Sequence, residues 1–284
     1  MEQLPEIDIT SAEFGDLYDE LPLWSAPFGL MLLDRVPMKP GSTILDVGAG
    51  TGFLTIELAE RCGSGVKVIA VDPWQAAVDR LRRKINQRHL KNIVVLQQAC
   101  ETLELPEASV DLIVSNLGIN NFSDPERALE NCHRVARPGA KLLLTTNLVG
   151  HMAEFYDTLR TILIEEGQSD QLDALEAHVN HRGTIDSVTG LLRRLGFEIV
   201  ETVTDSFRMR FADGSSLLRH YFVRFAFLPA WKSVVIDSPS RIFATLERRL
   251  NQVAEQNGEL ALTIPMACVV ARKPCATDLP TASP

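Results

Sequence analysis

Short apolar runs rich in β-branched residues alternate with segments of helical periodicity along most of the chain. The runs that predict strands in the first half lie at 43–47, 66–71, 92–97, 110–115 and 141–146. Segments with apolar residues every three or four positions predict helices at 52–61, 75–87, 125–135 and 185–195. Continuous apolar runs are typical of strands that are buried on both faces. The pattern therefore predicts an α/β fold with a doubly wound, mostly parallel sheet.

Two further strands are expected nearer the C-terminus. Gly196 should end the helix at 185–195, and the strand after it should cover 197–203. The last strand should cover 262–272. The turn at 137–139, Arg-Pro-Gly, is expected to precede the fifth strand.

The sequence from 43 to 53 predicts a loop that binds a nucleotide cofactor. A buried strand carries Asp46 near its end, glycines follow at Gly48, Gly50 and Gly52, and the chain then resumes helical period. Glycine lets the backbone turn sharply and approach a ligand closely, and the helix N-terminus comes next. Strand, turn and helix thus occur in the order that such a site needs.

A second carboxylate follows at a suitable separation. The run at 66–71 ends in Asp72, about 20 residues beyond the loop, where an acid at a strand end can bind both ribose hydroxyls. Dinucleotide sites use the spacing G-x-G-x-x-G, whereas here an acid stands two positions before the first of three alternate glycines. An NAD-dependent oxidoreductase that uses the same turn is an alternative, which this spacing disfavours.

The motif D-V-G-A-G-T-G at 46–52 resembles the first motif of the class I S-adenosylmethionine-dependent methyltransferases. The resemblance implies a Rossmann-like sheet of seven strands, with an antiparallel last strand between the fifth and the sixth, and S-adenosyl-L-methionine as cofactor. In that family Asp46 would organise the cationic amino-acid end of the cofactor, and Asp72 would bind its ribose. The candidate cofactor-binding residues are Asp46, Gly48, Ala49, Gly50, Gly52, Asp72, Pro73, Cys100, Glu101 and Asn116.

The segment after the fourth strand narrows the class of acceptor. Residues 115–124 lack the N/D-P-P-Y/F motif of amide and adenine N-methyltransferases. Residues 118–124 are instead similar to the G-L-R-N-V-T-D segment of the quinone-biosynthesis C-methyltransferases and their relatives (methyltransferase type 11), with Asn120 where that group has arginine. Ala99 replaces the aspartate with which relatives bind adenine, so contacts from the Cys100 backbone or the Glu101 side chain are expected. The resemblance implies a small-molecule acceptor, not a quinone in particular.

Composition and charge argue against several other classes. The 284 residues, 45% of them hydrophobic, can bury a substantial core. A net charge of −9 argues against a nucleic-acid substrate, and the basic residues between 80 and 91 are expected to form a solvated helix face. Five cysteines without a C-x-x-C pair, an acidic N-terminal segment and the lack of a long apolar run predict a cytoplasmic protein without signal peptide or membrane insertion.

Regions outside the minimal fold should contain the substrate chemistry. We expect a helical cover at 1–37, a methyltransferase domain at 38–272 and a disordered tail at 273–284. Two insertions, 150–183 and 206–259, are expected to form a substrate lid, the second with two helices. The second insertion holds eight of the chain's 18 aromatic residues (12 Phe, 3 Tyr and 3 Trp). Such enrichment suits an apolar lid, or equally packing against the sheet or against the second subunit of a homodimer.

Candidate acid or base residues are Tyr18, His151 and His220, each in or beside one of these regions. His178 and His181 have the spacing of one helix face, but the sequence offers no third ligand, so no metal site is expected.

Arg208 and Arg210 alternate with Phe207, Met209 and Phe211, which is the pattern of a half-exposed strand. The two arginines are expected to face solvent, although they could bind a substrate carboxylate.

These features together predict methyl transfer from S-adenosyl-L-methionine to a small, apolar or aromatic metabolite. The transfer would be an in-line displacement at an oxygen, carbon or nitrogen of the acceptor. A non-catalytic protein that keeps the cofactor fold is a further alternative, next to the oxidoreductase.

Overall fold

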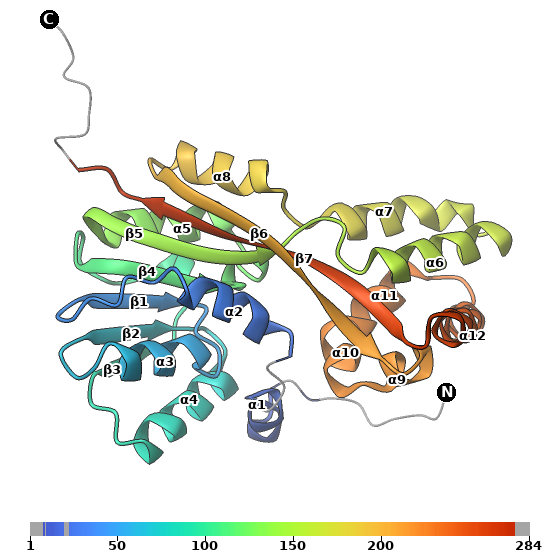
Figure 1. Ribbon diagram of the computed structural model, residues 1–284, viewed down its shortest axis with the longest axis horizontal. Coiled ribbons are helices and arrows are strands. Elements are labelled where there is room, and N and C mark those ends of the chain that lie inside the picture. Colours follow the sequence, from blue (N-terminus) through green and yellow to red (C-terminus); the bar gives the residue numbers. More distant parts are fainter. Residues whose placement is uncertain (1–7, 9, 20–22, 276–284) are drawn as a thin grey trace, which may run out of the picture. The chain divides into compact units, whose positions relative to one another are not determined.

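The computed structural model describes residues 8, 10–19 and 23–275, and its described part contains a seven-stranded sheet of order β3-β2-β1-β4-β5-β7-β6 (Figure 1). The strands are β1 (Thr43–Val47), β2 (Lys67–Val71), β3 (Ile93–Leu96), β4 (Val110–Asn116), β5 (Ala136–Asn147), β6 (Glu198–Phe211) and β7 (Leu260–Arg272).

The first five strands pair in parallel, and β7 does not. β1 lies between β2 and β4, with β3 and β5 as the next neighbours, all in parallel register. The backbone N–H of Gly139 donates to Lys273 O, whereas that of Leu148, further along the chain, donates to Pro265 O. Residue numbers therefore fall along β7 in the direction in which they rise along β5, so the two strands are antiparallel. The predicted seven-stranded sheet, with its last strand between the fifth and the sixth, is confirmed.

The helices fall into those packed on the sheet and those of the insertions. The first group is α1 (Ala12–Asp19), α2 (Ser25–Leu33), α3 (Phe53–Arg61), α4 (Gln75–Gln87), α5 (Pro125–Val135) and α8 (Ile185–Arg194), with the 3-10 turns η1 (Cys100–Thr102) and η2 (Gly118–Asn120). The second is α6 (Ala153–Glu165), η3 (Ser169–Gln171), α7 (Leu172–Asn180), α9 (Gly214–Arg219), α10 (Tyr221–Ala226), α11 (Leu228–Val234) and α12 (Pro239–Asn257).

Local sequence explains where two of the sheet helices begin. At α5, the Asp124 side chain accepts a hydrogen bond from Arg127 N at 3.0 Å, and Pro125 occupies the first turn, where a missing N–H has no cost. At α8, Thr184 and Ser187 each bind the other's backbone N–H in a capping box.

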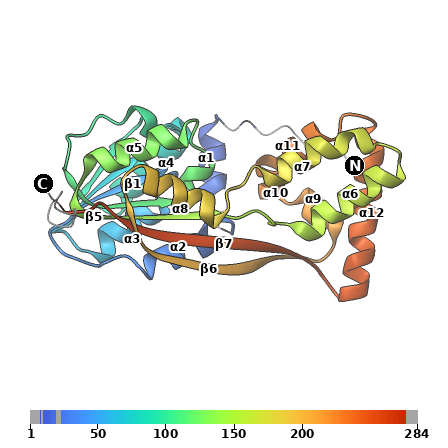
Figure 2. The ribbon, with the colours of Figure 1, turned by 90° about the horizontal axis from the view of Figure 1, so that it is seen from above.

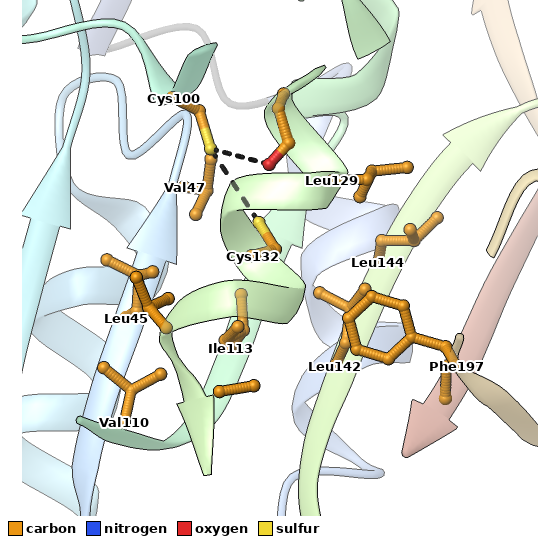
Figure 3. Close-up of a cluster of buried hydrophobic side chains, with 14 of the residues drawn as sticks. Leu45, Val47, Cys100, Val110, Ile113, Leu129, Cys132, Leu142, Leu144 and Phe197 are labelled. Carbon is orange, nitrogen blue, oxygen red and sulfur yellow. Dashed lines mark hydrogen bonds between the residues drawn. The ribbon is translucent and has the colours of Figure 1, made fainter. Parts of the chain in front are cut away.

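Alternate side chains of the central strands face opposite layers of helices. Ile69 and Val71 belong to the buried cluster formed with α5 and α8, whereas Ala70 between them belongs to the cluster formed with α3 and α4. Accordingly α5 and α8 lie on one side of the strands and α3 on the other (Figure 2). Figure 3 shows the first cluster, in which Leu45 of β1 and Phe197 belong to the same buried set.

The described chain divides into two compact units. We call residues 10–146, 184–204 and 266–275 the sheet unit, and residues 147–183 and 205–265 the helical unit. β6 and β7 contribute residues to both. Each unit is described by itself below.

The fifth strand begins earlier than the sequence predicts. We expected a turn at 137–139 and a strand from 141, but β5 already starts at Ala136. Val110 pairs with Ala136 and Leu112 with Lys141, so the intervening residues form an irregularity inside the strand instead of a turn before it. The segment still pairs on its other side, where Gly139 N donates to the carbonyl oxygen of Lys273, the residue after β7.

The second insertion also differs from the prediction. Instead of starting at 206 with two helices, the region begins with the second half of β6 and continues with α9 to α12. Met209 is buried while Arg208 and Arg210 are exposed, so the half-exposed strand pattern is confirmed. Arg210 binds Glu259.

The prediction that the basic residues of α4 form a purely solvated face is wrong. Arg80 and Lys84 bind Asp19 of α1 at 3.0 and 2.5 Å, and Arg83 binds Asp16. These basic residues therefore attach α1 to the sheet unit, because α1 offers acids at matching positions.

Some predictions lie at the limits of the described chain. Residues 1–7, 9 and 20–22 of the expected cover and residues 276–284 of the expected tail lie outside the described residues. No described helix combines the length and the apolar character that crossing a bilayer requires.

Candidate functional site

The glycine turn between β1 and α3 is held in one shape by its own backbone. Gly48, Gly50 and Gly52 have φ values of 72°, 54° and 92°, a region that side chains with a Cβ rarely adopt. Gly48 N donates to Val71 O at 2.9 Å, which ties the turn to the end of β2. A Cβ on Gly52 would lie 2.2 Å from Leu81 Cδ1, whereas a Cβ on Gly50 would meet nothing within 4 Å. The turn therefore packs tightly against α4 at Gly52 and leaves open space at Gly50.

Asp72, at the end of β2, closes this turn. Its Oδ2 accepts a hydrogen bond from Gly50 N and its Oδ1 one from Trp74 N, both at 2.8 Å. Burial raises the pKa of Asp72, while the two backbone hydrogen bonds act to lower it. Each carboxylate oxygen can accept a further hydrogen bond, so Asp72 can bind a ligand diol while it fixes the protein backbone.

Asp46 lies deeper than Asp72. It is 1% exposed, and its Oδ2 accepts a hydrogen bond from Thr55 Oγ1 at 2.6 Å. Burial raises the pKa of Asp46 to about 7, with a further contribution from the negative charge of Asp72. The two acids are thus close enough to repel each other, as expected of two carboxylates at one edge of the sheet. A cation placed beside them would favour the ionised form of both.

Tyr18 lies at the same edge, beside Trp74. Its ring contacts the Trp74 ring in a T-shaped arrangement, with 5.1 Å between the centroids. Burial, and next the charge of Asp72, raise the pKa of Tyr18, so its hydroxyl is close to that carboxylate. A phenol whose pKa is raised stays protonated at neutral pH, so it can donate a hydrogen bond but is not available as a general base.

Cys100 and Glu101, in η1, direct their side chains to α5 and to the loop before it. Cys100 Sγ lies 3.3 Å from the carbonyl oxygen of Ala128 and 3.8 Å from Cys132 Sγ (Figure 3). Glu101 Oε1 accepts hydrogen bonds from the N–H and hydroxyl groups of Ser123 and from Asp124 N. These bonds hold the pKa of Glu101 below its usual value. For adenine, the geometry favours the backbone of this segment over the two side chains.

Asn131 is a positioning residue that the sequence did not reveal. It is 7% exposed, and its amide Nδ2 donates to the carbonyl oxygens of Cys100 and Glu101 at 3.0 and 2.9 Å. It therefore fixes the backbone of η1 from the side of α5. Its position in an ordinary amphipathic helix carries no motif that could have predicted this.

Asn116, at the end of β4, connects three elements. Its Nδ2 donates to Ser25 O at the start of α2, and its Oδ1 accepts from Thr145 Oγ1 of β5 at 2.7 Å. The following Gly118 has no room for a side chain, since a Cβ there would lie 2.3 Å from Ser115 Oγ. Asn116 thus positions α2 beside the ends of β4 and β5.

His151 and His220 belong to the helical unit. His151 is 1% exposed, and burial together with Arg182, His181 and His178 lowers its pKa to about 3. Burial also lowers the pKa of His220. The other candidate site residues, Tyr18 included, belong to the sheet unit.

No three histidine, cysteine or acidic side chains of the described residues are arranged to hold a metal ion.

Comparison with known proteins finds a family match that lies within the sheet unit. Residues 45–144 match the family model described as "Methyltransferase domain". Arsenite methyltransferase of Halobacterium salinarum is 26% identical over 164 residues, which is 58% of this chain and 39% of that protein. Ubiquinone/menaquinone biosynthesis C-methyltransferase UbiE of Escherichia coli is 25% identical over 179 residues, covering 60% of this chain and 71% of its own length. The chain thus spans well under half of the first relative.

Solved structures show the same fold. A SAM-dependent methyltransferase from Aquifex aeolicus superposes with a TM-score of 0.51 at 23% identity, covering 70% of this chain and 93% of that one. Phospholethanolamine N-methyltransferase 2 of Haemonchus contortus, solved with phosphomonomethylethanolamine and S-adenosylhomocysteine, superposes with a TM-score of 0.52 at 16% identity. The match covers 87% of this chain and 52% of that one. Identities this low support the fold alone.

Proposed function

We propose that this chain, a class I S-adenosylmethionine-dependent methyltransferase, transfers a methyl group to a small, apolar or aromatic metabolite. The observation that carries the proposal is the glycine turn with two interacting carboxylates, Asp46 and Asp72, at one edge of the sheet unit. The family match argues against the NAD-dependent alternative, because it is a methyltransferase domain that covers the turn.

The residues present suit the cofactor, S-adenosyl-L-methionine. The open space at Gly50 leaves room beside the turn, and the remaining lone pairs of Asp72 can accept hydrogen bonds from a ribose diol. Asp46 has a pKa of about 7, so a ligand ammonium would stabilise its carboxylate form. When bound, the cofactor supplies a methyl group on a positively charged sulfur.

The chain's own residues then position the reactants and exclude water. In-line displacement needs alignment of the acceptor behind the methyl carbon more than it needs a strong base. None of the candidate bases suits proton abstraction near neutral pH. The raised pKa of Tyr18 keeps it a neutral phenol, and His151, with its pKa lowered to about 3, is a weak base. We therefore propose an acceptor that is itself nucleophilic, with Tyr18 acting as a hydrogen-bond donor beside Asp72.

The kind of acceptor is inferred from charge and from the helical unit. A net charge of −9 disfavours a nucleic acid. The relatives are named for acceptors as different as arsenite and quinone precursors, so their names do not transfer. The aromatic helices α10 and α11 favour an apolar or aromatic molecule. Cytoplasmic location and homodimer formation remain predictions, and cysteine usage supports the first of them.

Calorimetry with S-adenosylhomocysteine tests the site. Asp72→Asn should weaken binding at least tenfold, because an amide cannot accept the bond from Gly50 and the ligand hydroxyls as a carboxylate does. Asp111→Asn is the matched control. Asp111 also accepts a backbone N–H, from Thr43 at 2.8 Å, but near the amino-terminal ends of β1 and β4, and its substitution should leave affinity within twofold.

Two outcomes would contradict the proposal. One is the absence of measurable binding to the wild-type protein, and the other is an equal loss in the two variants. A labelled methyl donor incubated with a library of small aromatic and apolar metabolites, followed by mass spectrometry, then tests transfer. Cofactor binding without labelled product from any acceptor would favour the non-catalytic alternative.

A further inference from the structure

The helical unit contains a cavity of its own. It has a volume of about 200 Å³ and is lined by His151, Tyr156, His178, His181, Arg182, Ala226, Phe227 and Ala230. These residues all belong to the helical unit, and they come from the start of α6, from α7 and its end, and from the α10–α11 junction. A dry cavity of about 150 Å³ is enough for a benzene ring. This cavity therefore has room for a small ring and a polar substituent.

One wall of the cavity is fixed by a hydrogen-bonded aromatic group. Trp231 Nε1 donates to the Tyr156 hydroxyl at 3.0 Å, and that hydroxyl lies 3.1 Å from His178 Nε2. The rings of Phe227 and Trp231 are stacked, with 5.7 Å between their centroids. Tyr156 and Trp231 are both fully buried. Such packing makes this wall rigid before any ligand arrives.

The other wall contains the cation Arg182, and no described residue that lines the cavity offers it a counter-charge. Arg182 Nε and His151 Nδ1 are buried, and neither has a hydrogen-bond partner among the described residues. Within the same residues Arg182 takes part in no ion pair of 4.0 Å or less, and no carboxylate lines the cavity. By contrast Arg160, on α6, is bound by Asp157 and Glu176.

The ionisation of these groups follows from the same surroundings. Burial lowers the pKa of His178, and the nearby His181 and Arg182 lower it further. Burial also lowers the pKa of Arg182, but a guanidinium stays charged in proteins. Arg182 is thus a permanent cation whose planar fork matches the two oxygens of a carboxylate or phosphate.

We propose that this cavity binds the oxyanion group of a small aromatic acid, with Arg182 and His151 holding the oxygens and the lining rings of Tyr156 and Phe227, supported from behind by Trp231, contacting the ring of the ligand. Buried polar atoms in proteins nearly always have partners, and an oxyanion would supply partners for both orphaned nitrogens at once. Nothing in the motif of the sheet unit requires such a pocket. Binding here also does not depend on methyl transfer, so it can be tested without a cofactor.

Calorimetry on the full chain with benzoate, phenyl phosphate, inorganic phosphate and the neutral benzamide tests the proposal. Benzoate or phenyl phosphate should bind at least tenfold more tightly than benzamide. The preferred anion then separates a carboxylate from a phosphate ligand, and inorganic phosphate measures the contribution of the ring. Equal affinities for benzoate, phenyl phosphate and benzamide, or no binding of any anion at millimolar concentration, would overturn the proposal.

Two matched variants locate the binding. Arg182→Gln should weaken binding of the preferred anion at least tenfold, whereas Arg160→Gln, which removes the same charge from the same unit, should change it less than twofold. Equal losses of affinity in both variants would mean that the anion responds only to the net positive charge of the unit and not to Arg182 in the cavity. If the Asp72→Asn variant loses S-adenosylhomocysteine binding but still binds the anion, the anion site is distinct from the cofactor site.

Discussion

The glycine turn of the sheet unit and the cavity of the helical unit differ in how their buried polar groups are satisfied. In the sheet unit Asp72 accepts hydrogen bonds from the turn that it faces, and Asp46 accepts one from Thr55. In the helical unit the buried His151 Nδ1 and Arg182 Nε have no partner among the described residues. The turn is therefore shaped by the protein alone, whereas the cavity is completed only by a ligand. A preorganised site binds its ligand without a large entropic cost of ordering side chains. A site with unpaired buried donors favours a ligand that supplies the missing hydrogen-bond acceptors.

The largest expected effect comes from breaking the shape of the turn. Gly52→Ala should lower the free energy of unfolding by about 2–5 kcal/mol, because the new Cβ combines positive-φ strain with overpacking against Leu81. Urea denaturation measures this loss.

Gly50→Ala is the matched control for that loss. It has positive φ but open space around the added Cβ, so its cost should be only about 1–2 kcal/mol. Its affinity for S-adenosylhomocysteine should nevertheless fall, since the Cβ enters the space that the ligand needs. If both alanine variants are equally destabilised, contact with Leu81 is not what restricts the turn.

The next effect concerns the rigid wall of the cavity. Tyr156→Phe removes the hydroxyl that accepts from Trp231 Nε1, and it leaves that buried N–H without its partner. The expected loss of stability is about 1–3 kcal/mol. A double-mutant cycle with Trp231→Phe should give a coupling of about 1 kcal/mol, and additive losses would show that the hydrogen bond contributes nothing.

The buried Asp46 of the sheet unit and the buried His151 of the helical unit should change the pH dependence of stability in opposite directions. Asp46 has a pKa of about 7, above its usual 3.8, so the folded state binds the proton more tightly and stability falls as pH rises from about 4 to 7. His151 has a pKa of about 3, below its usual 6.5, so the unfolded state binds the proton more tightly and stability rises with pH across that interval.

Single variants separate these slopes. Asp46→Asn should make stability rise more steeply between pH 4 and 6.5, and His151→Asn should make it rise less, each by at most about 1.4 kcal/mol per pH unit. Denaturation at a series of pH values measures the slopes. A parallel shift of the curve in either variant, without a change of slope, would mean that the residue does not titrate as its burial indicates.

The sheet unit was predictable because its signals are local. A buried strand, the spaced glycines and the acid at the end of the next strand all lie within thirty residues, from Thr43 to Asp72. Each has a backbone consequence that does not depend on distant packing. The irregularity at the start of β5 was missed, because pairing with β7 on the far side keeps those residues in the strand.

The helical unit was not predictable in this way. His151, His178 and Arg182 lie near one another only because α6 and α7 pack together, and Phe227 joins them from more than forty residues further along. No spacing rule connects such residues. The sequence named His151 as one of three candidate acid or base residues, whereas the structure shows that burial, and next the neighbouring Arg182, lower its pKa.

The smallest expected effect comes from breaking the ion pair that attaches α1 to α4. This change tests whether the preformed cofactor site extends to Tyr18. Lys84 and Asp19 are only 16% and 14% exposed as side chains, which makes their ion pair less screened than a surface pair. Lys84→Ala should cost at most about 1 kcal/mol. It should also speed amide exchange in α1 and weaken S-adenosylhomocysteine binding a few-fold, because α1 carries Tyr18 to the side of Asp72. Arg88→Ala, which breaks an exposed pair with Glu60, should change neither. If the Lys84 variant accelerates exchange in α1 without any effect on binding, Tyr18 is not part of the cofactor site, and the preorganised region ends at the turn itself.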